Sequence, residues 1–165
     1  MDLKGALQHA MKAEIEGREL YRIASERSDD KKAKKMFLYL SQEEDSHFEA
    51  LKGMYEAYLK KEELSVPKLP RVADFSHAES PIFSSSFKER IADKHWEMSA
   101  LSIALKLEQD SIGYYRRMAD ETGDGRLKDF FLDLSDWEKT HSEALTQELT
   151  YLQEEYWEKN NFAPF

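Results

Sequence analysis

Residues 6–51 and 100–145 are two copies of one segment, related by a shift of 94 positions along the chain. Without a gap, 18 of the 46 aligned positions are identical, whereas unrelated sequences of ordinary composition would share roughly three. Apolar residues recur at every third or fourth position in both halves of each copy, as they do in amphipathic helices. The repeat therefore predicts that the chain contains the same helical hairpin twice.

Residues that break helices are scarce and leave long uninterrupted stretches. The four prolines fall at positions 67, 70, 81 and 164, so that most of both copies is free to be helical. Asp30 is suited to cap a helix that begins at the next residue. The periodicity predicts helices over about 3–27, 31–62 and 125–158, with a further helical face over 99–122. We therefore expect an all-α fold.

The periodicity is lost over residues 65–86, which hold three of the four prolines. An irregular linker of this length is unusual in a compact domain and needs a reason. If the second and third helices run parallel, the chain must return along a 30-residue helix, about 45 Å, and a linker of about 22 extended residues reaches about 75 Å. The sequence therefore predicts one four-helix bundle domain over 1–165, with hairpin one at 3–62, a crossover at 63–87 and hairpin two at 88–158.

Composition excludes several classes of protein. The formal charge of −9 leaves no basic surface to neutralise phosphates, so we expect no nucleic-acid partner. The absence of cysteine excludes disulfides and sites in which thiolates hold zinc or iron–sulfur clusters. No apolar run approaches the roughly 20 residues of a membrane span, and the N-terminus lacks the apolar core of a signal peptide. We therefore expect a cytoplasmic protein with no membrane partner.

Polar residues interrupt the apolar faces of the predicted helices at positions that the repeat preserves. Glu44 and His47 lie on the same helix face as Phe37, Leu40 and Leu51. The shift of 94 places Glu138 and His141 at the equivalent positions, and it also aligns two further inward glutamates, Glu14 and Glu108, on the first and third predicted helices.

Four carboxylates and two imidazoles could not stay unpaired in a bundle core, because each buried charge costs several kcal/mol and like charges repel. Divalent metal would remove that cost. One glutamate from each of two helices and Glu-x-x-His from each of the other two is the pattern of di-iron and di-manganese carboxylate bundles. The predicted metal ligands, which would also serve catalysis through the metals, are Glu14, Glu44, His47, Glu108, Glu138 and His141.

The sequence also allows other assignments. A single Glu-x-x-His in an acidic helical protein is usually a solvated face, and a degenerate repeat could keep the pattern without the metal. Glu16 and Asp110 also match across the repeat, but they lie about 200° around the helix from Glu14 and Glu108. We interpret them as surface groups or as groups that support the ligands.

Tyr21 and Tyr115 follow the inward glutamates of their helices by two turns on the same face. They are predicted either to pack in the core or to donate hydrogen bonds to ligand carboxylates, which would give them a supporting catalytic role. Gly17 and Ser111 are small residues one turn from those glutamates and would leave space for metal or oxygen. Three histidines have no partner under the repeat and are interpreted as ordinary residues: His9, His77 and His95.

With these motifs, both hairpins resemble the ferritin-like superfamily, and specifically a rubrerythrin-like di-iron carboxylate protein. The resemblance implies two Fe ions per chain, although manganese or zinc can occupy such ligands. It implies that Glu44 and Glu138 bridge the two ions and that Glu14 and Glu108 are terminal ligands. It also implies that each motif histidine binds one ion.

The resemblance further implies a function. We expect a di-iron oxidoreductase that reduces hydrogen peroxide or dioxygen, with oxidative stress as its setting. The alternatives are a ferroxidase or iron-storage protein, and a non-catalytic helical scaffold or metal sensor. Rubrerythrins proper carry a rubredoxin module, for which this sequence has no cysteines. We therefore expect a separate electron-donor protein. The expected assembly is a homodimer.

One ligand position departs from the resemblance. Rubrerythrins usually carry an extra carboxylate one turn after the ligand glutamate of the third helix, and Ser111 occupies that position here. Peroxide chemistry that relies on an iron shifting toward this carboxylate is not implied for this chain.

Overall fold

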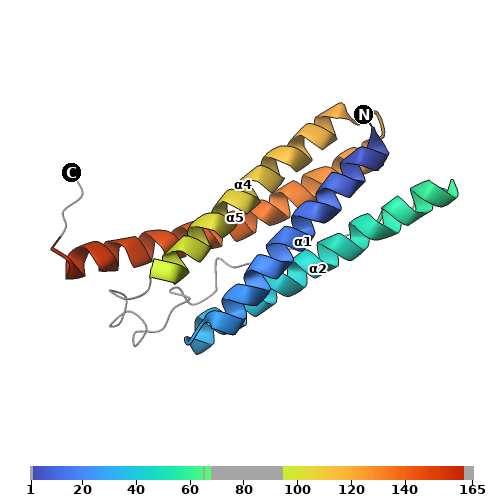
Figure 1. Cartoon of the computed structure of the whole chain (residues 1–165). Helices are drawn as coiled ribbons and strands as arrows, with labels where there is room; N and C mark the ends of the chain where they lie inside the picture. The colour runs from blue at the N-terminus through green and yellow to red at the C-terminus, as the bar shows by residue number, and fades with distance from the viewer. Residues whose placement is uncertain (1, 65, 68–94, 162–165) are drawn as a thin grey trace.

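The computed structural model describes residues 2–64, 66–67 and 95–161. These residues form four α-helices and no strand, which confirms the expected all-α class (Figure 1). Most of the predicted crossover, 63–87, and the start of hairpin two, 88–94, lie outside the described residues. The helices are α1 (Leu3–Arg27), α2 (Lys31–Lys60), α4 (His95–Glu121) and α5 (Gly125–Lys159).

Equivalent aspartates cap the second helix of each hairpin. The carboxylate of Asp30 accepts hydrogen bonds from the backbone N–H groups of Lys32 and Ala33, at 2.9 and 3.0 Å. Asp124, its counterpart under the repeat, accepts one from the N–H of Arg126 at 2.9 Å. These bonds satisfy donors that have no partner within the first turn of a helix, so that α2 and α5 begin where the sequence predicts.

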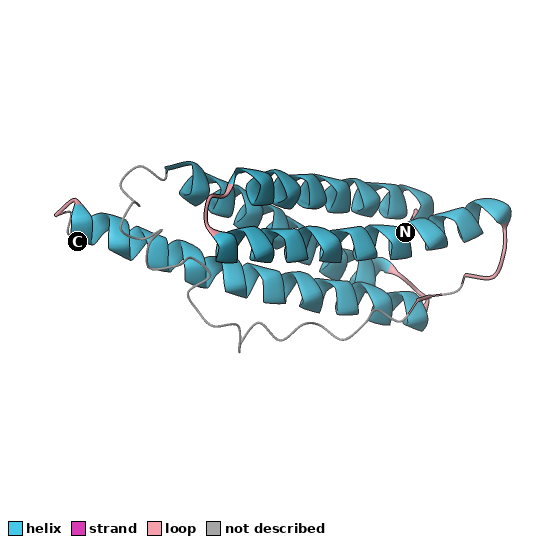
Figure 2. Cartoon of the chain, turned by 90° about the horizontal axis from the view of Figure 1, so that it is seen from below, coloured by secondary structure: helices cyan, strands magenta, loops and turns pink. Residues whose placement is uncertain are grey.

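The helices assemble as two antiparallel hairpins. Figure 1 shows α1 beside α2 and α4 beside α5, with α1 also packed against α4. Helices α2 and α4 run in the same direction, so that the end of α2 and the start of α4 lie at opposite ends of the bundle (Figures 1 and 2). This is the arrangement for which a long crossover is needed, and it confirms the predicted four-helix bundle.

Equivalent serines link the two helices within each hairpin. The Ser41 hydroxyl donates to the backbone carbonyl of Arg18, at 3.1 Å, and links α2 to α1. Ser135, its counterpart, donates to the carbonyl of Ile112 at 3.5 Å and links α5 to α4. Each serine lies three residues before a predicted ligand glutamate, so the contact fixes the helix pair close to the site.

The core consists of two apolar clusters at different levels of the bundle. One cluster contains Leu7 and Phe131, and the other contains Phe37 and Leu145, all of them 0–2% exposed. The predicted ligand residues occupy positions along each helix between these two levels. Apolar side chains therefore close the polar middle of the bundle on both sides.

Outward positions carry the charged residues. Lys12 and Glu16, for example, form an exposed ion pair at 3.5 Å on the outer face of α1. Within the described residues, no helix is long and apolar enough to cross a membrane.

Candidate metal centre

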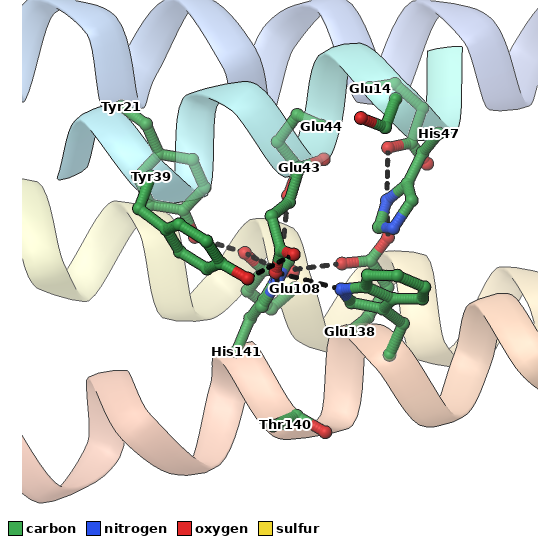
Figure 3. Close-up of polar contacts among 12 residues, drawn as sticks. Glu14, Tyr21, Tyr39, Glu43, Glu44, His47, Glu108, Glu138, Thr140 and His141 are labelled. Carbon is green, nitrogen blue, oxygen red and sulfur yellow. Dashed lines mark hydrogen bonds and ion pairs between the residues drawn. The ribbon is translucent and has the colours of Figure 1, made fainter. Parts of the chain in front are cut away.

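All four helices send carboxylates or imidazoles into the middle of the bundle (Figure 3). In each of two groups, one ligand atom from every residue lies within 4.8 Å of the others. Glu44 and Glu138 belong to both groups. The first group is Glu14, Glu44, His47 and Glu138, and the second is Glu44, Glu108, Glu138 and His141.

The first group gathers around the δ nitrogen of His47. This nitrogen lies 3.2 Å from Oε2 of Glu14 and 3.3 Å from Oε1 of Glu138. The His47 side chain is fully buried, and the side chains of Glu14 and Glu138 are each 1% exposed. The carboxylates of α1 and α5 therefore meet an imidazole of α2 out of contact with water.

The second group gathers around the δ nitrogen of His141. This nitrogen lies 3.2 Å from Oε2 of Glu138, 3.3 Å from Oε1 of Glu44 and 3.6 Å from Oε1 of Glu108. Glu138 thus directs one oxygen to each histidine, and the two imidazole rings stack with their centres 6.1 Å apart. The bridging role that the resemblance implies for Glu138 stays a prediction.

Buried oxygens without hydrogen bonds show that the cluster fits a cation. Both oxygens of Glu138 and Oε1 of Glu44 are buried and accept no hydrogen bond within the described part of the chain. Unsatisfied buried carboxylate oxygens are costly. Oxygen atoms that converge with imidazole nitrogens are the donors that iron, manganese and zinc accept, so the residues present fit a pair of such ions.

Gly17 makes room for one of these carboxylates. A Cβ at this position would lie 3.2 Å from Oε2 and 3.3 Å from Cδ of Glu44, closer than ordinary van der Waals contact. The sequence suggested that Gly17 leaves space for metal or oxygen, but in the structure the Glu44 carboxylate uses that space. Ser111, its counterpart under the repeat, is half-buried.

Burial and mutual repulsion set the charge of the glutamates. Burial, together with the negative charge of Glu138, raises the pKa of Glu108 to about 8 and the pKa of Glu44 well above its usual value. Burial also acts to raise the pKa of Glu138, but the neighbouring His47 and His141 outweigh it and lower that pKa. Glu138 is therefore held ionised while Glu44 and Glu108 resist ionisation, as expected when like charges share a site.

The two buried tyrosines link the hairpins. Tyr21 on α1 donates its hydroxyl hydrogen bond to Oε1 of Glu108 on α4, and Tyr115 on α4 donates to Oε1 of Glu14 on α1. Each tyrosine is at most 1% exposed, and Tyr21 also stacks against Phe37 with ring centres 6.4 Å apart. The tyrosines both pack in the core and hydrogen-bond the carboxylates, and the partner of each lies on the opposite hairpin.

The sequence pattern did not identify Glu43, a carboxylate that contacts the predicted ligand His141. Oε2 of Glu43 on α2 lies 2.9 Å from Nε2 of His141 and accepts a hydrogen bond from Nε1 of Trp137 at 3.0 Å. Its other oxygen accepts from the hydroxyl of Tyr39 at 2.6 Å (Figure 3). These bonds lower the pKa of Glu43 although burial acts to raise it. Its partners on α5 could not be read from the spacing on α2.

The remaining candidates that the structure describes lie away from the centre. Glu16 and Asp110, the alternative pair, are exposed and pair with Lys12 and Lys106 on the outer faces of α1 and α4. His9 is exposed, and its ring lies against Tyr114. The interpretation of His77 and of the His95 side chain falls outside what the structure describes.

Comparison with known proteins places the chain in a family. A hypothetical protein from Pyrococcus furiosus has a similar fold, with a TM-score of 0.69 and 22% sequence identity over 93% of this chain and 92% of that one. Among curated proteins, none matches. A model of the Rubrerythrin family matches residues 6–149, which contain most of both hairpins and both Glu-x-x-His motifs. The chain therefore belongs to the rubrerythrin family, within the ferritin-like superfamily.

Proposed function

We propose that this protein is a di-iron oxidoreductase that reduces hydrogen peroxide or dioxygen with electrons from a separate donor protein. The observation that supports this most strongly is the overlap of the two ligand groups, which share Glu44 and Glu138. Two ions held by shared carboxylates lie close enough to act on one small oxidant. Membership of a family of di-iron carboxylate proteins points the same way.

The proposed chemistry needs two electrons. Two bound Fe(II) ions would supply one electron each, and with two protons these break the O–O bond of hydrogen peroxide to give two waters. With dioxygen as oxidant, the same two electrons and two protons give hydrogen peroxide. The proposed donor protein would then return two electrons to the centre.

The side chains around the centre have distinct tasks in this proposal. Glu14 with His47 and Glu108 with His141 would each complete one ion position, and apolar layers above and below keep water out. The hydroxyls of Tyr21 and Tyr115 orient Glu108 and Glu14 by donating hydrogen bonds to them. Orientation of ligands by such outer contacts commonly contributes to metal affinity and activity.

Retention of both ions distinguishes this proposal from storage. Each ion position has its own histidine as well as two shared carboxylates, which suits an ion pair that changes oxidation state in place. Storage requires ions that move on into a mineral core. We propose a homodimer that keeps both irons and is oxidised faster by hydrogen peroxide than by dioxygen.

Anaerobic reconstitution with Fe(II) tests this function. The protein should bind two irons per chain, and stopped-flow mixing should show faster oxidation by hydrogen peroxide than by dioxygen. Glu44→Ala or Glu138→Ala should abolish paired binding, because each residue serves both positions. Glu16→Ala is the matched control on an exposed site and should still bind two irons.

The outcomes separate the alternatives. Hundreds of irons per assembly, together with a large shell detected by light scattering, would favour an iron-storage protein. Absence of metal binding would favour a non-catalytic scaffold. If Glu16→Ala lost its metal while Glu14→Ala kept two irons, the assignment of ligands to the inner helix face would be wrong.

A further inference from the structure

The two ion positions differ at one pair of residues that the repeat aligns. Glu43 precedes the Glu-x-x-His motif of α2, and the shift of 94 places Trp137 before the motif of α5. The ligand types on both sides are the same, namely glutamate and histidine at matching positions. A difference between the two ion positions must therefore come from what surrounds the ligands.

Three contacts hold the Glu43 carboxylate: two hydrogen-bond donors and one imidazole nitrogen. The indole N–H of Trp137 and the hydroxyl of Tyr39 donate to its two oxygens, at 3.0 and 2.6 Å. Its Oε2 also lies 2.9 Å from Nε2 of His141 (Figure 3). The Glu43 side chain is 11% exposed and the His141 side chain is fully buried. The carboxylate therefore closes the outer side of the His141 ring.

This contact determines which nitrogen of His141 faces the carboxylate cluster as an acceptor. In the neutral ring that a metal ion requires, a carboxylate beside Nε2 favours the proton on that nitrogen, so that Nδ1 would be the nitrogen that binds the ion. Nδ1 is the atom that lies 3.2–3.6 Å from the oxygens of the second group.

Within the described residues, His47 has no equivalent contact. Its Nδ1 faces Glu14 and Glu138 in the same way. Its Nε2 is buried and has no hydrogen-bond partner among the described residues. The ring of Trp137 meets the His47 ring edge-on, with centres 4.9 Å apart, so the residue that matches Glu43 packs against the imidazole instead.

We propose that Glu43 is a positioning residue that makes the two ion positions unequal, so that the His141 position binds divalent metal more tightly than the His47 position. A carboxylate behind a ligand histidine orients the ring and makes it a stronger ligand, and its loss commonly costs 10–100-fold in metal affinity. This inference rests on the proposed metal centre and adds the order in which its two positions fill.

Anaerobic titration with Co²⁺, followed by visible absorption and calorimetry, measures both positions without any catalytic step. The wild-type protein should bind two Co²⁺ in two resolved steps. Glu43→Ala should weaken the tighter step by about 10–100-fold and leave the weaker step within about twofold. Glu43→Gln keeps an acceptor oxygen and the packing, so its loss should be smaller but fall on the same step. Glu49→Ala, an exposed glutamate of α2, is the matched control and should change neither step.

Double variants assign the effect to one histidine. In a His47→Ala background, Glu43→Ala should still weaken binding by the same factor, whereas in a His141→Ala background it should have almost no further effect. Circular dichroism of each metal-free variant confirms that the helices are intact.

The results separate this inference from the proposed function. An equal loss in both backgrounds, or unchanged binding in Glu43→Ala and Glu43→Gln, would overturn the role of Glu43 while two bound ions upheld the metal centre. A wild-type protein that binds no Co²⁺, Fe²⁺ or Mn²⁺ would instead overturn the proposed function.

Discussion

Removal of the Tyr21 hydroxyl tests whether the two hairpins are joined through the site. In Tyr21→Phe the ring and its packing against Phe37 remain, but Glu108 loses a buried donor from the opposite hairpin. Leaving a buried acceptor without its partner costs about 1–3 kcal/mol. For a chain of this size, each kcal/mol lowers the melting temperature by about 2–4 °C, so a decrease of about 2–12 °C is expected.

Urea unfolding of the metal-free protein measures this cost as a free energy of unfolding. Tyr115→Phe should behave alike because its hydroxyl donates to Glu14 across the same interface. Tyr58→Phe, at a residue 40% exposed, is the control and should stay within about 0.5 kcal/mol of the wild type. The cost for Tyr21→Phe should also rise as the pH passes about 8, where Glu108 ionises and its hydrogen bond becomes charge-assisted.

A double-mutant cycle supplies the decisive result. Tyr21→Phe and Glu108→Ala should be coupled by about 1–3 kcal/mol, whereas Tyr21→Phe and Glu14→Ala should be nearly additive. Coupling to Glu14, two turns away on the same helix, or no coupling at all, would refute the contact between hairpins.

Two further predictions concern the glutamates. Gly17→Ala should displace the Glu44 carboxylate and weaken the binding of both Co²⁺ ions by about tenfold, in the range seen when outer contacts of ligands are lost. Gly53→Ala is the control, because a Cβ at that position meets nothing, and equal Co²⁺ titrations of the two variants would contradict the close contact at Gly17. The metal-free protein should become more stable as the pH falls from 7 to 5.5, because Glu108, with its pKa raised from 4.5 to about 8, keeps a proton in the folded state that the unfolded chain releases. One such proton contributes about 1.4 kcal/mol per pH unit, or about 2 kcal/mol over this range, and a flat urea midpoint, or the same slope in Glu108→Gln, would disprove it. Stability should fall again below about pH 4.5 as Glu138, whose pKa is lowered, is protonated first in the unfolded chain.

Much of the architecture follows from local sequence signals. Apolar periodicity, with the cap at Asp30, placed three helix starts at the residues observed, because these signals act within a few turns of the chain. The end of α2 was less well predicted: Lys61 adopts a left-handed conformation with φ 57°, and the helix stops at Lys60 rather than at 62. Helix ends depend on a single backbone rotation that periodicity does not record.

The candidate site, too, was predicted only in part from the sequence. The repeat identified six buried residues that the structure gathers into two groups, because residues that interrupt an apolar face at conserved spacing must share the bundle interior. Their roles as metal ligands remain predictions. Glu43 went unnoticed because it lies off the apolar stripe and its partner histidine is 98 residues away.

The sequence by itself determined that two similar hairpins each direct a Glu-x-x-His motif and one further glutamate into a shared interior, because periodicity and spacing are properties of single helices. Only the tertiary structure decided which groups meet across hairpins, including Tyr21 with Glu108, Tyr115 with Glu14, and Glu43 with His141. Those contacts depend on the rotation and level at which one helix packs against another. That geometry is set by the packing of all four helices, and no local pattern in the chain encodes it.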